Sequence, residues 1–212
     1  MNIGIFGGSF NPIHYGHIAL AEAALREGFV DEVWLLISPH NTLKHHASLA
    51  DETERLRLAK MALEQHRRDA DAHQLPTWSE AKAAHHIVAS DFEFSLERPS
   101  FTWQTLQALQ THFPQHRFSL IIGGDNWECF DRWRNWKDIL LTTPIIVYPR
   151  QDSILTRREG FPAPRVLDAP LFPFSSTDIR RALQANASDQ QLAEWLPADI
   201  INSCRRLYGQ NT

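Results

Sequence analysis

The first 25 residues constrain the fold most strongly, because they join an apolar run to a glycine pair and a helix-forming segment. Residues 2–6 read Asn-Ile-Gly-Ile-Phe, which is typical of a buried strand, and residues 18–25 carry apolar side chains at helical spacing. Gly7 and Gly8 lie between them. Glycines let backbone N–H groups approach a ligand closely, and a helix N-terminus favours a bound anion. The segment therefore predicts a strand, an anion-binding glycine turn and a helix.

Two histidines follow the glycine pair. His14 and His17 are three residues apart, so their side chains share a face if both belong to the first turn of the helix. A lone histidine is more often structural, but two of them flanking Gly16 beside a predicted anion pocket favour a functional role. Paired imidazoles next to a phosphate-sized pocket indicate nucleotide chemistry.

Further apolar runs along the chain predict more strands. They alternate with helical segments, which is typical of an α/β fold with a mostly parallel sheet. One helix is expected over residues 51–65, with Asp51 or Thr53 as its cap, and another begins near Ser100 or Thr102. The predicted strands cover residues 32–37, 87–94, 118–122 and 145–148, with a short one at 165–167.

The second half of the chain suggests how the domain is organised. Residues 66–86 are polar and have no clean period, so we expect an excursion from the core, partly helical, with Trp78 packing back onto it. Residues 175–180 are a capping run that starts a helix, and short helices follow to the end. No internal repeat is visible. We therefore predict a single domain over residues 1–212 with an excursion at about 66–86.

Composition excludes several classes of function. The chain has 212 residues, a net charge of −4 and a pI near 6.2, which argues against nucleic acid as a partner. No apolar run approaches the roughly 20 residues that a membrane span needs, and a signal-peptide pattern is absent. Cys129 and Cys204 lack metal-site spacing, and most of the 11 histidines are dispersed, so we expect no protein-bound metal. A reduced, cytoplasmic setting fits best.

The carboxyl ends of the predicted strands collect polar and cationic groups. Ligands of open α/β sheets bind outside these ends, so the groups are expected to converge on one crevice. The collection suits a polyphosphate. Neither the P-loop pattern nor the Gly-x-Gly-x-x-Gly pattern of dinucleotide-binding oxidoreductases is present. The segments concerned are residues 7–17, the loop with Lys44, residues 123–125, Arg150 and residues 175–180.

Two of these segments resemble signatures of the nucleotidyltransferase superfamily. Residues 7–17, Gly-Gly-Ser-Phe-Asn-Pro-Ile-His-Tyr-Gly-His, are similar to its His-x-Gly-His motif, and residues 175–180, Ser-Ser-Thr-Asp-Ile-Arg, are similar to its Ser-Ser-Thr-x-Ile-Arg motif. Residues 99–102 and 121–125, followed by Trp133, resemble the bacterial nicotinate-nucleotide adenylyltransferases. The resemblance implies a doubly wound, mostly parallel sheet of the Rossmann-like nucleotidyltransferase type with C-terminal helices. It also implies ATP and nicotinate mononucleotide as substrates, with Mg²⁺ bound through the ATP phosphates.

The resemblance also implies roles for matching residues. His14 and His17 would contact the ATP phosphates, and Arg180 would hold the β- and γ-phosphates. Lys44 matches a catalytic position, although its loop departs from the family's usual Pro-Pro-His-Lys/Arg wording, and Phe101 stands where the family usually has tyrosine. The implied ATP-binding residues are Gly7, Gly8, Ser9, Phe10, Gly123, Asp125, Arg150, Ser176 and Thr177, and the implied nicotinate nucleotide-binding residues are Thr102, Trp103 and Trp133.

The implied reaction explains why no general base is visible. A nucleotide monophosphate has a second pKa of about 6, so it is mostly a dianion at neutral pH and can attack phosphorus directly. Catalysis is then mainly positioning and charge stabilisation. A sister adenylyltransferase acting on nicotinamide mononucleotide or phosphopantetheine stays open, as do a non-catalytic nucleotide-binding regulator and a homo-oligomer.

Overall fold

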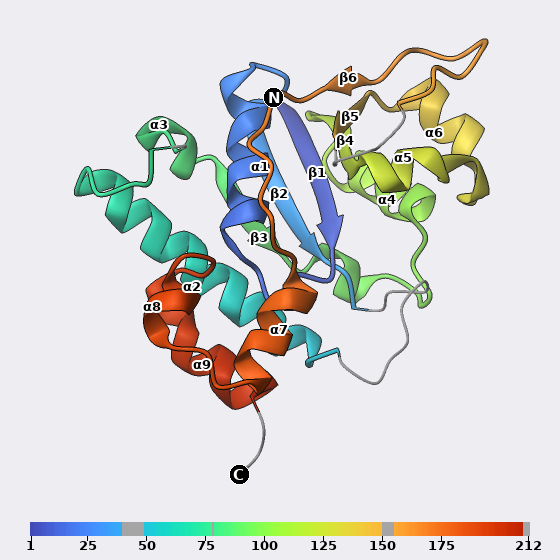
Figure 1. Ribbon diagram of the computed structural model, residues 1–212. Coiled ribbons are helices and arrows are strands. Elements are labelled where there is room, and N and C mark those ends of the chain that lie inside the picture. The colour runs from blue at the N-terminus through green and yellow to red at the C-terminus, as the bar shows by residue number, and fades with distance from the viewer. Residues whose placement is uncertain (40–48, 78, 150–154, 210–212) are drawn as a thin grey trace.

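A computed structural model describes residues 1–39, 49–77, 79–149 and 155–209, and Figure 1 shows its arrangement. A sheet of six parallel strands in the order β3-β2-β1-β4-β5-β6 forms its centre. Lys44, Trp78 and Arg150 lie outside the described residues. The strands are β1 (Asn2–Gly8), β2 (Glu32–Ile37), β3 (Ile87–Ser90), β4 (Arg117–Gly123), β5 (Ile145–Tyr148) and β6 (Arg165–Val166).

Helices pack on both faces of this sheet, which confirms the predicted doubly wound α/β fold. In β4, Ile121 belongs to one hydrophobic cluster, whereas Leu120 and Ile122 belong to the other. Successive strand residues point to opposite faces, so both faces need apolar cover. The first cluster includes buried residues of α1 (Tyr15–Arg26), α2 (Glu52–Asp71), α7 (Ser176–Gln184), α8 (Asp189–Ala193) and α9 (Ala198–Tyr208). The second includes α4 (Thr102–His112), α5 (Gly124–Glu128) and α6 (Trp136–Thr142), which group together in Figure 1.

Helix α2 is longer than the predicted span of 51–65. Asp51 caps it as expected, accepting a hydrogen bond of 2.9 Å from the backbone N–H of Thr53. The helix continues to Asp71 because His66 is buried there, with its Nε2 atom 2.7 Å from Oε1 of Glu22 on α1. A polar residue on the buried face hid this continuation from the sequence pattern. Among the described residues of the connection that follows, the one helix is the short α3 (Ala81–Ala84), and the single-domain count stays a prediction.

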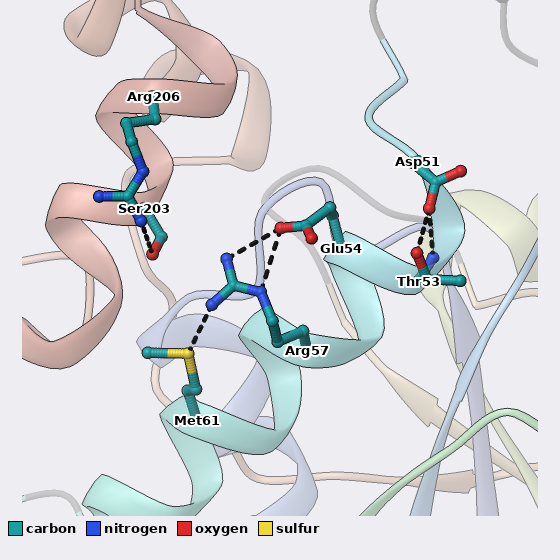
Figure 2. A network of polar contacts seen from close by, with 7 residues as sticks. All are labelled: Asp51, Thr53, Glu54, Arg57, Met61, Ser203 and Arg206. Atoms are coloured by element: carbon teal, nitrogen blue, oxygen red, sulfur yellow. Dashed lines mark hydrogen bonds and ion pairs between the residues drawn. The ribbon is translucent and has the colours of Figure 1, made fainter.

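The outer face of α2 is polar. Figure 2 shows Arg57 donating hydrogen bonds of 2.8 and 3.1 Å to Oε2 of Glu54 and one of 3.0 Å to the sulfur of Met61. The side chains of Arg57 and Glu54 are 42% and 38% exposed, so this pair contributes about 0.5 kcal/mol at most. The stability of α2 therefore comes from its buried face.

Two predicted boundaries are wrong at the entry to α4. The strand expected over residues 87–94 ends at Ser90, and η2 (Phe92–Ser95), a 3-10 helix, follows. The turn forms because the backbone N–H of Phe92 bonds to the Ser90 hydroxyl at 3.2 Å. The N-cap of α4 is Phe101, rather than Ser100 or Thr102, and its backbone N–H donates to Oε1 of Gln104 at 3.2 Å. Thr102 is thus the first residue of the helix.

Candidate active site

The turn after β1 is shaped by Phe10. Its φ of +43° is in the left-handed region, which is unfavourable for a non-glycine residue. The ring is only 1% exposed and packs edge-on against Phe6 and His17, with centroid separations of 5.6 and 4.9 Å. A Cβ on Gly8 would lie 3.1 Å from this ring, whereas a Cβ on Gly7 would meet nothing within 4 Å. Glycine at position 8 therefore leaves room for the ring of Phe10, whereas the space beside Gly7 holds no other atom of the described residues within 4 Å.

His14 and His17 stack on one another, which confirms the expected shared face. Their ring centroids are 3.7 Å apart, with an interplanar angle of 28°. His14 is the N-cap of α1, and its backbone N–H donates to Nδ1 of His17 at 3.3 Å. Because Nδ1 of His17 accepts, Nε2 carries the proton in the neutral ring and is a donor. A Cβ on Gly16 would lie 3.0 Å from Nδ1 of His14, so glycine makes room for the stack.

The N-terminus of α7 is bonded directly to this turn. The Ser176 hydroxyl donates to the Pro12 carbonyl at 3.0 Å, and Nη1 of Arg180 donates to the Asn11 carbonyl at 2.7 Å. Arg180 also bonds to the Ser176 carbonyl and to the hydroxyl of Thr177, each at 3.2 Å. The two sequence signatures, about 160 residues apart, therefore form one structural unit.

A capping box fixes the start of α7. The Ser175 hydroxyl accepts from the backbone N–H of Asp178 at 3.4 Å, while the Asp178 carboxylate accepts from the backbone N–H of Ser175 at 2.9 Å and from its hydroxyl at 2.6 Å. The hydrogen bond from the Ser175 hydroxyl holds the pKa of Asp178 below its usual range. Residues 175–178 are therefore held in place before any ligand binds.

The carboxyl end of β4 lies beside the same turn. The register pairs Phe6 of β1 with Ile121 of β4, so Gly8 and Gly123 end their strands at the same level. A Cβ on Gly123 would collide with the carboxylate of Asp125 and lie 3.0 Å from the ring of Tyr148. Gly123 thus lets Asp125 fold back over the strand end, next to the glycine turn.

A second group of predicted residues surrounds the start of α4. Trp133 follows η3 (Phe130–Arg132), and its ring packs against the buried ring of Phe130, with centroids 4.9 Å apart and an interplanar angle of 32°. The guanidinium of Arg134 lies 5.1 Å over the ring of Phe101, the N-cap of α4. This contact joins the segment of Trp133 to the helix start that carries Thr102, so the residues expected to bind the nicotinate nucleotide come from adjoining segments.

One residue of the site was not expected from the sequence. Arg55 of α2 is completely buried, and its Nη1 atom donates to the carbonyl of Ser9 at 2.6 Å. The burial of Arg55 could have been inferred from the sequence, because residues 55, 59, 62 and 66 follow helical spacing and all lie on the buried face of α2. An arginine in that series signals a buried polar contact.

Three further features of the structure bear on membrane, metal and ligand binding. Within the described ranges, no helix is long and apolar enough to cross a membrane, and no three His, Cys, Asp or Glu side chains cluster closely enough to hold a metal ion. A cavity of about 390 Å³ lies at the C-terminal end of α1, away from the glycine turn. It is lined by Arg26, Thr77, Ser79, Glu80, Asp168, Ala169 and Pro170.

Comparison with known proteins agrees with this geometry. The cytidylyltransferase-like family model matches residues 5–182. A probable nicotinate-nucleotide adenylyltransferase of Bacteroides fragilis is 42% identical over 180 residues, covering 85% of this chain and 81% of that protein. One from Cytophaga hutchinsonii is 35% identical over 208 residues, covering 98% of each.

A solved structure has the same fold. The nicotinic acid mononucleotide adenylyltransferase of Plasmodium falciparum, complexed with NaAD, superposes with a TM-score of 0.72 at 18% identity, covering 95% of each chain. The chain is therefore a nucleotidyltransferase that belongs to the cytidylyltransferase-like family and, within it, to the nicotinate-nucleotide adenylyltransferases.

Proposed function

We propose that this protein transfers the adenylyl group of ATP to nicotinate mononucleotide, releasing pyrophosphate and forming nicotinate adenine dinucleotide. The observation that carries the proposal is the bonding of Ser176 and Arg180 to the glycine turn beside the stacked pair of His14 and His17. This unit combines imidazole, guanidinium and hydroxyl donors at the carboxyl ends of parallel strands, where nucleotides bind.

The reaction needs positioning more than proton transfer. A phosphate oxygen of the acceptor, already a dianion, forms a bond to the α-phosphorus of ATP. The bond from that phosphorus to the oxygen bridging to the β-phosphate breaks, and the electron pair leaves with pyrophosphate. The barrier comes from repulsion between anions and from charge that develops on pyrophosphate. Preorganised donors lower both contributions.

His17 is suited to donate to the phosphates of ATP. Its Nδ1 atom accepts the backbone N–H of His14, so the neutral ring carries its proton on Nε2, and an imidazole N–H is a donor that suits phosphate oxygens. We assign His14 and His17 to the α- and β-phosphates, with His17 the more critical. Arg180, Ser176 and Thr177 then hold the β- and γ-phosphates, and Lys44 adds a further cation.

The remaining ATP contacts follow from the strand ends. Gly7, Gly8 and the turn residues Ser9 and Phe10 cradle the phosphates, and Gly123 and Asp125 line the adenosine pocket. Support comes from the equal level of the β1 and β4 ends and from the open space above Gly7. We also assign Arg150 to the binding of ATP.

The acceptor site is assigned to the start of α4. The positive end of the helix dipole favours the carboxylate of nicotinate over the neutral amide of nicotinamide. Thr102 and the backbone N–H of Trp103 are the donors in this assignment, and Trp133 stacks on the pyridine ring. Support comes from the contact of Arg134 with Phe101, which brings these segments together.

The donor set also fits Mg²⁺ carried by ATP. Mg²⁺ retains several waters and commonly binds substrate phosphates, so it does not require a carboxylate cage. When bound, it neutralises charge on the phosphates. The protein residues beside those phosphates are the histidine pair and Arg180. We place the enzyme in the reduced cytoplasm, where its two free cysteines suit the redox conditions.

Paired acceptors test the proposal. Pyrophosphate release from ATP is measured with nicotinate mononucleotide, nicotinamide mononucleotide and phosphopantetheine. We expect the acid to be used at least tenfold more efficiently than either alternative. Equal efficiency with the amide would overturn the acid assignment, and faster turnover of phosphopantetheine would indicate the sister activity. Tight ATP binding without pyrophosphate release from any acceptor would indicate a regulator.

A further inference from the structure

Arg55 combines complete burial with a direct bond to the glycine turn. Its exposed fraction is 0%, whereas Arg57, two residues further along α2, bonds along the surface to Glu54 and Met61 (Figure 2). Burial lowers the pKa of the Arg55 guanidinium, yet guanidinium groups stay charged throughout the physiological range. A full positive charge therefore lies beneath the turn.

The hydrogen bonds of Arg55 converge on this turn. Nη1 donates to the Ser9 carbonyl at 2.6 Å, and Nε donates to the Ala50 carbonyl at 2.9 Å. The backbone N–H of Ala50 in turn donates to Oδ1 of Asn11 at 3.1 Å. Nη2 is buried without a hydrogen-bond partner in the part of the chain that the structure describes. Arg55 thus holds the turn directly through Ser9 and indirectly through Asn11.

Burying a charged side chain is unfavourable unless its partners compensate for the lost hydration. Removing a cation from water costs several kcal/mol, which is offset only when good partners surround it. Here both hydrogen-bond partners are neutral carbonyls, and no carboxylate makes an ion pair with Arg55 among the described residues. An apolar side chain of similar volume would fill the same space at lower cost. The position of the charge beneath a phosphate-binding turn is the feature that distinguishes it.

The bond to Ser9 also fixes the direction of a peptide group. In a trans peptide the C=O of one residue and the N–H of the next point in opposite directions. With the Ser9 carbonyl held toward α2, the N–H of Phe10 points away from α2. Phe10 has the unfavourable φ of +43°, and a conformation of this kind persists only when its surroundings enforce it. Arg55 is one of the groups that enforce it.

We propose that Arg55 is a positioning residue for ATP: it turns the Ser9 carbonyl away from the phosphates, orients the N–H of Phe10 toward them, and places a buried positive charge behind the turn. This inference rests on the proposed binding of ATP phosphates at the turn. It does not depend on the identity of the acceptor. Arg55 contacts no substrate and acts through the backbone of Ser9 and Phe10.

Arg67 provides a matched control on the same helix. Its Nη2 atom donates to the carbonyl of Ile87 at 2.6 Å, a bond of the same kind that does not involve the turn. Arg55→Lys and Arg67→Lys each retain the charge and remove the guanidinium fork. Arg55→Met additionally removes the charge. The measurements are the thermal midpoint, kcat, KM for each substrate, and the Kd of a non-hydrolysable ATP analogue by calorimetry.

For Arg55→Lys we expect a folded enzyme with kcat/KM for ATP lowered about tenfold to a hundredfold, because small displacements of a binding group have effects of that size. The analogue should bind more weakly, while KM for the acceptor stays within about twofold of the original value. Arg67→Lys should change the thermal midpoint without changing the kinetics. If Arg55→Met does not fold, the lysine variant alone decides the question.

Two outcomes would overturn the inference. One is an Arg55→Lys variant whose thermal midpoint falls while its ATP kinetics and analogue binding match those of the original enzyme. The other is equal loss for both substrates, as expected of general structural damage. Failure of the proposed function is distinguishable, because it would appear as missing turnover of nicotinate mononucleotide by the unsubstituted enzyme. The analogue titration would still compare Arg55→Lys with Arg67→Lys.

Discussion

The guanidinium of Arg180 donates a hydrogen bond of 2.7 Å to the backbone carbonyl of Asn11, which precedes it by 169 residues. Through this bond a helix near the end of the chain is fixed to the turn near its beginning. The turn is held from a second direction by Arg55 of α2. Two arginines on different helices therefore set the geometry of one short backbone segment.

Removing Arg180 should affect ATP far more than folding. For Arg180→Ala we expect kcat/KM for ATP to fall by about 10²–10³, the usual loss when a preorganised donor is removed from a charged site. Arg181→Ala is the matched control, since its side chain is 76% exposed on the same helix and lies 3.7 Å from Asp178. Steady-state kinetics of the two variants check this. Similar kinetics for both would contradict the role of Arg180.

The two glycines of the turn should respond differently to alanine. A Cβ at position 7 enters open space at the end of a central strand, so Gly7→Ala should fold normally and weaken ATP binding. A Cβ at position 8 meets the buried ring of Phe10, so Gly8→Ala should cost about 1–3 kcal/mol of stability. Urea unfolding and ATP titration separate the two effects. Unchanged ATP affinity in a well-folded Gly7→Ala variant would place the phosphates elsewhere.

The sequence predicted the parts of the fold that depend on apolar runs, and it missed those that depend on buried polar groups. Runs such as 118–122 have no other stable placement than a covered strand, so their strands and the parallel sheet were predictable. His66 bonds to Glu22, and Arg55 bonds to Ser9, and both partners belong to other segments of the chain. The local sequence pattern around His66 or Arg55 does not indicate these partners. Helical spacing could have placed both side chains on the buried face of α2, but it could not have identified the groups that they bond.

Glu93 should give the protein a pH-dependent stability. Burial raises the pKa of this carboxyl above its usual value, although hydrogen bonds from Thr105 and Ser38 oppose the shift. The folded state thus binds the proton of Glu93 more tightly than the unfolded state does. The resulting contribution to stability is complete below about pH 4.5, the usual pKa of the group, and is lost as the pH rises through the higher pKa of the folded state. Glu93→Gln keeps the acceptor for Thr105 and removes the titration.

Urea unfolding at pH 5 and pH 8 measures this effect. The free energy of unfolding of Glu93→Gln minus that of the original protein should be larger at pH 8 than at pH 5, because only the original protein loses stability as Glu93 ionises. Using the difference between the two proteins removes the contribution of other titrating groups. A difference that is the same at both pH values would show that burial of Glu93 does not influence its ionisation.

The preference for an acidic acceptor should depend on Thr102 more than on Trp133. Thr102 is the first residue of α4, where a hydroxyl and the helix dipole both favour a carboxylate. Losing a hydrogen bond to a charged group costs about 1.5–3 kcal/mol, so Thr102→Ala should lower kcat/KM for nicotinate mononucleotide about tenfold to a hundredfold. Turnover of nicotinamide mononucleotide should change little, because its amide carries no charge.

Trp133→Ala should instead lower turnover of both acceptors by similar factors, since a stacking surface does not distinguish the acid ring from the amide ring. Thr111→Ala serves as the control for Thr102→Ala. It lies in the last turn of the same helix, exposed, with its hydroxyl bonded at 2.9 Å to the carbonyl of Gln107. Kinetics with both acceptors give the ratio of the two efficiencies for each variant. A ratio that falls for Trp133→Ala and stays constant for Thr102→Ala would reverse the assignment of these two residues.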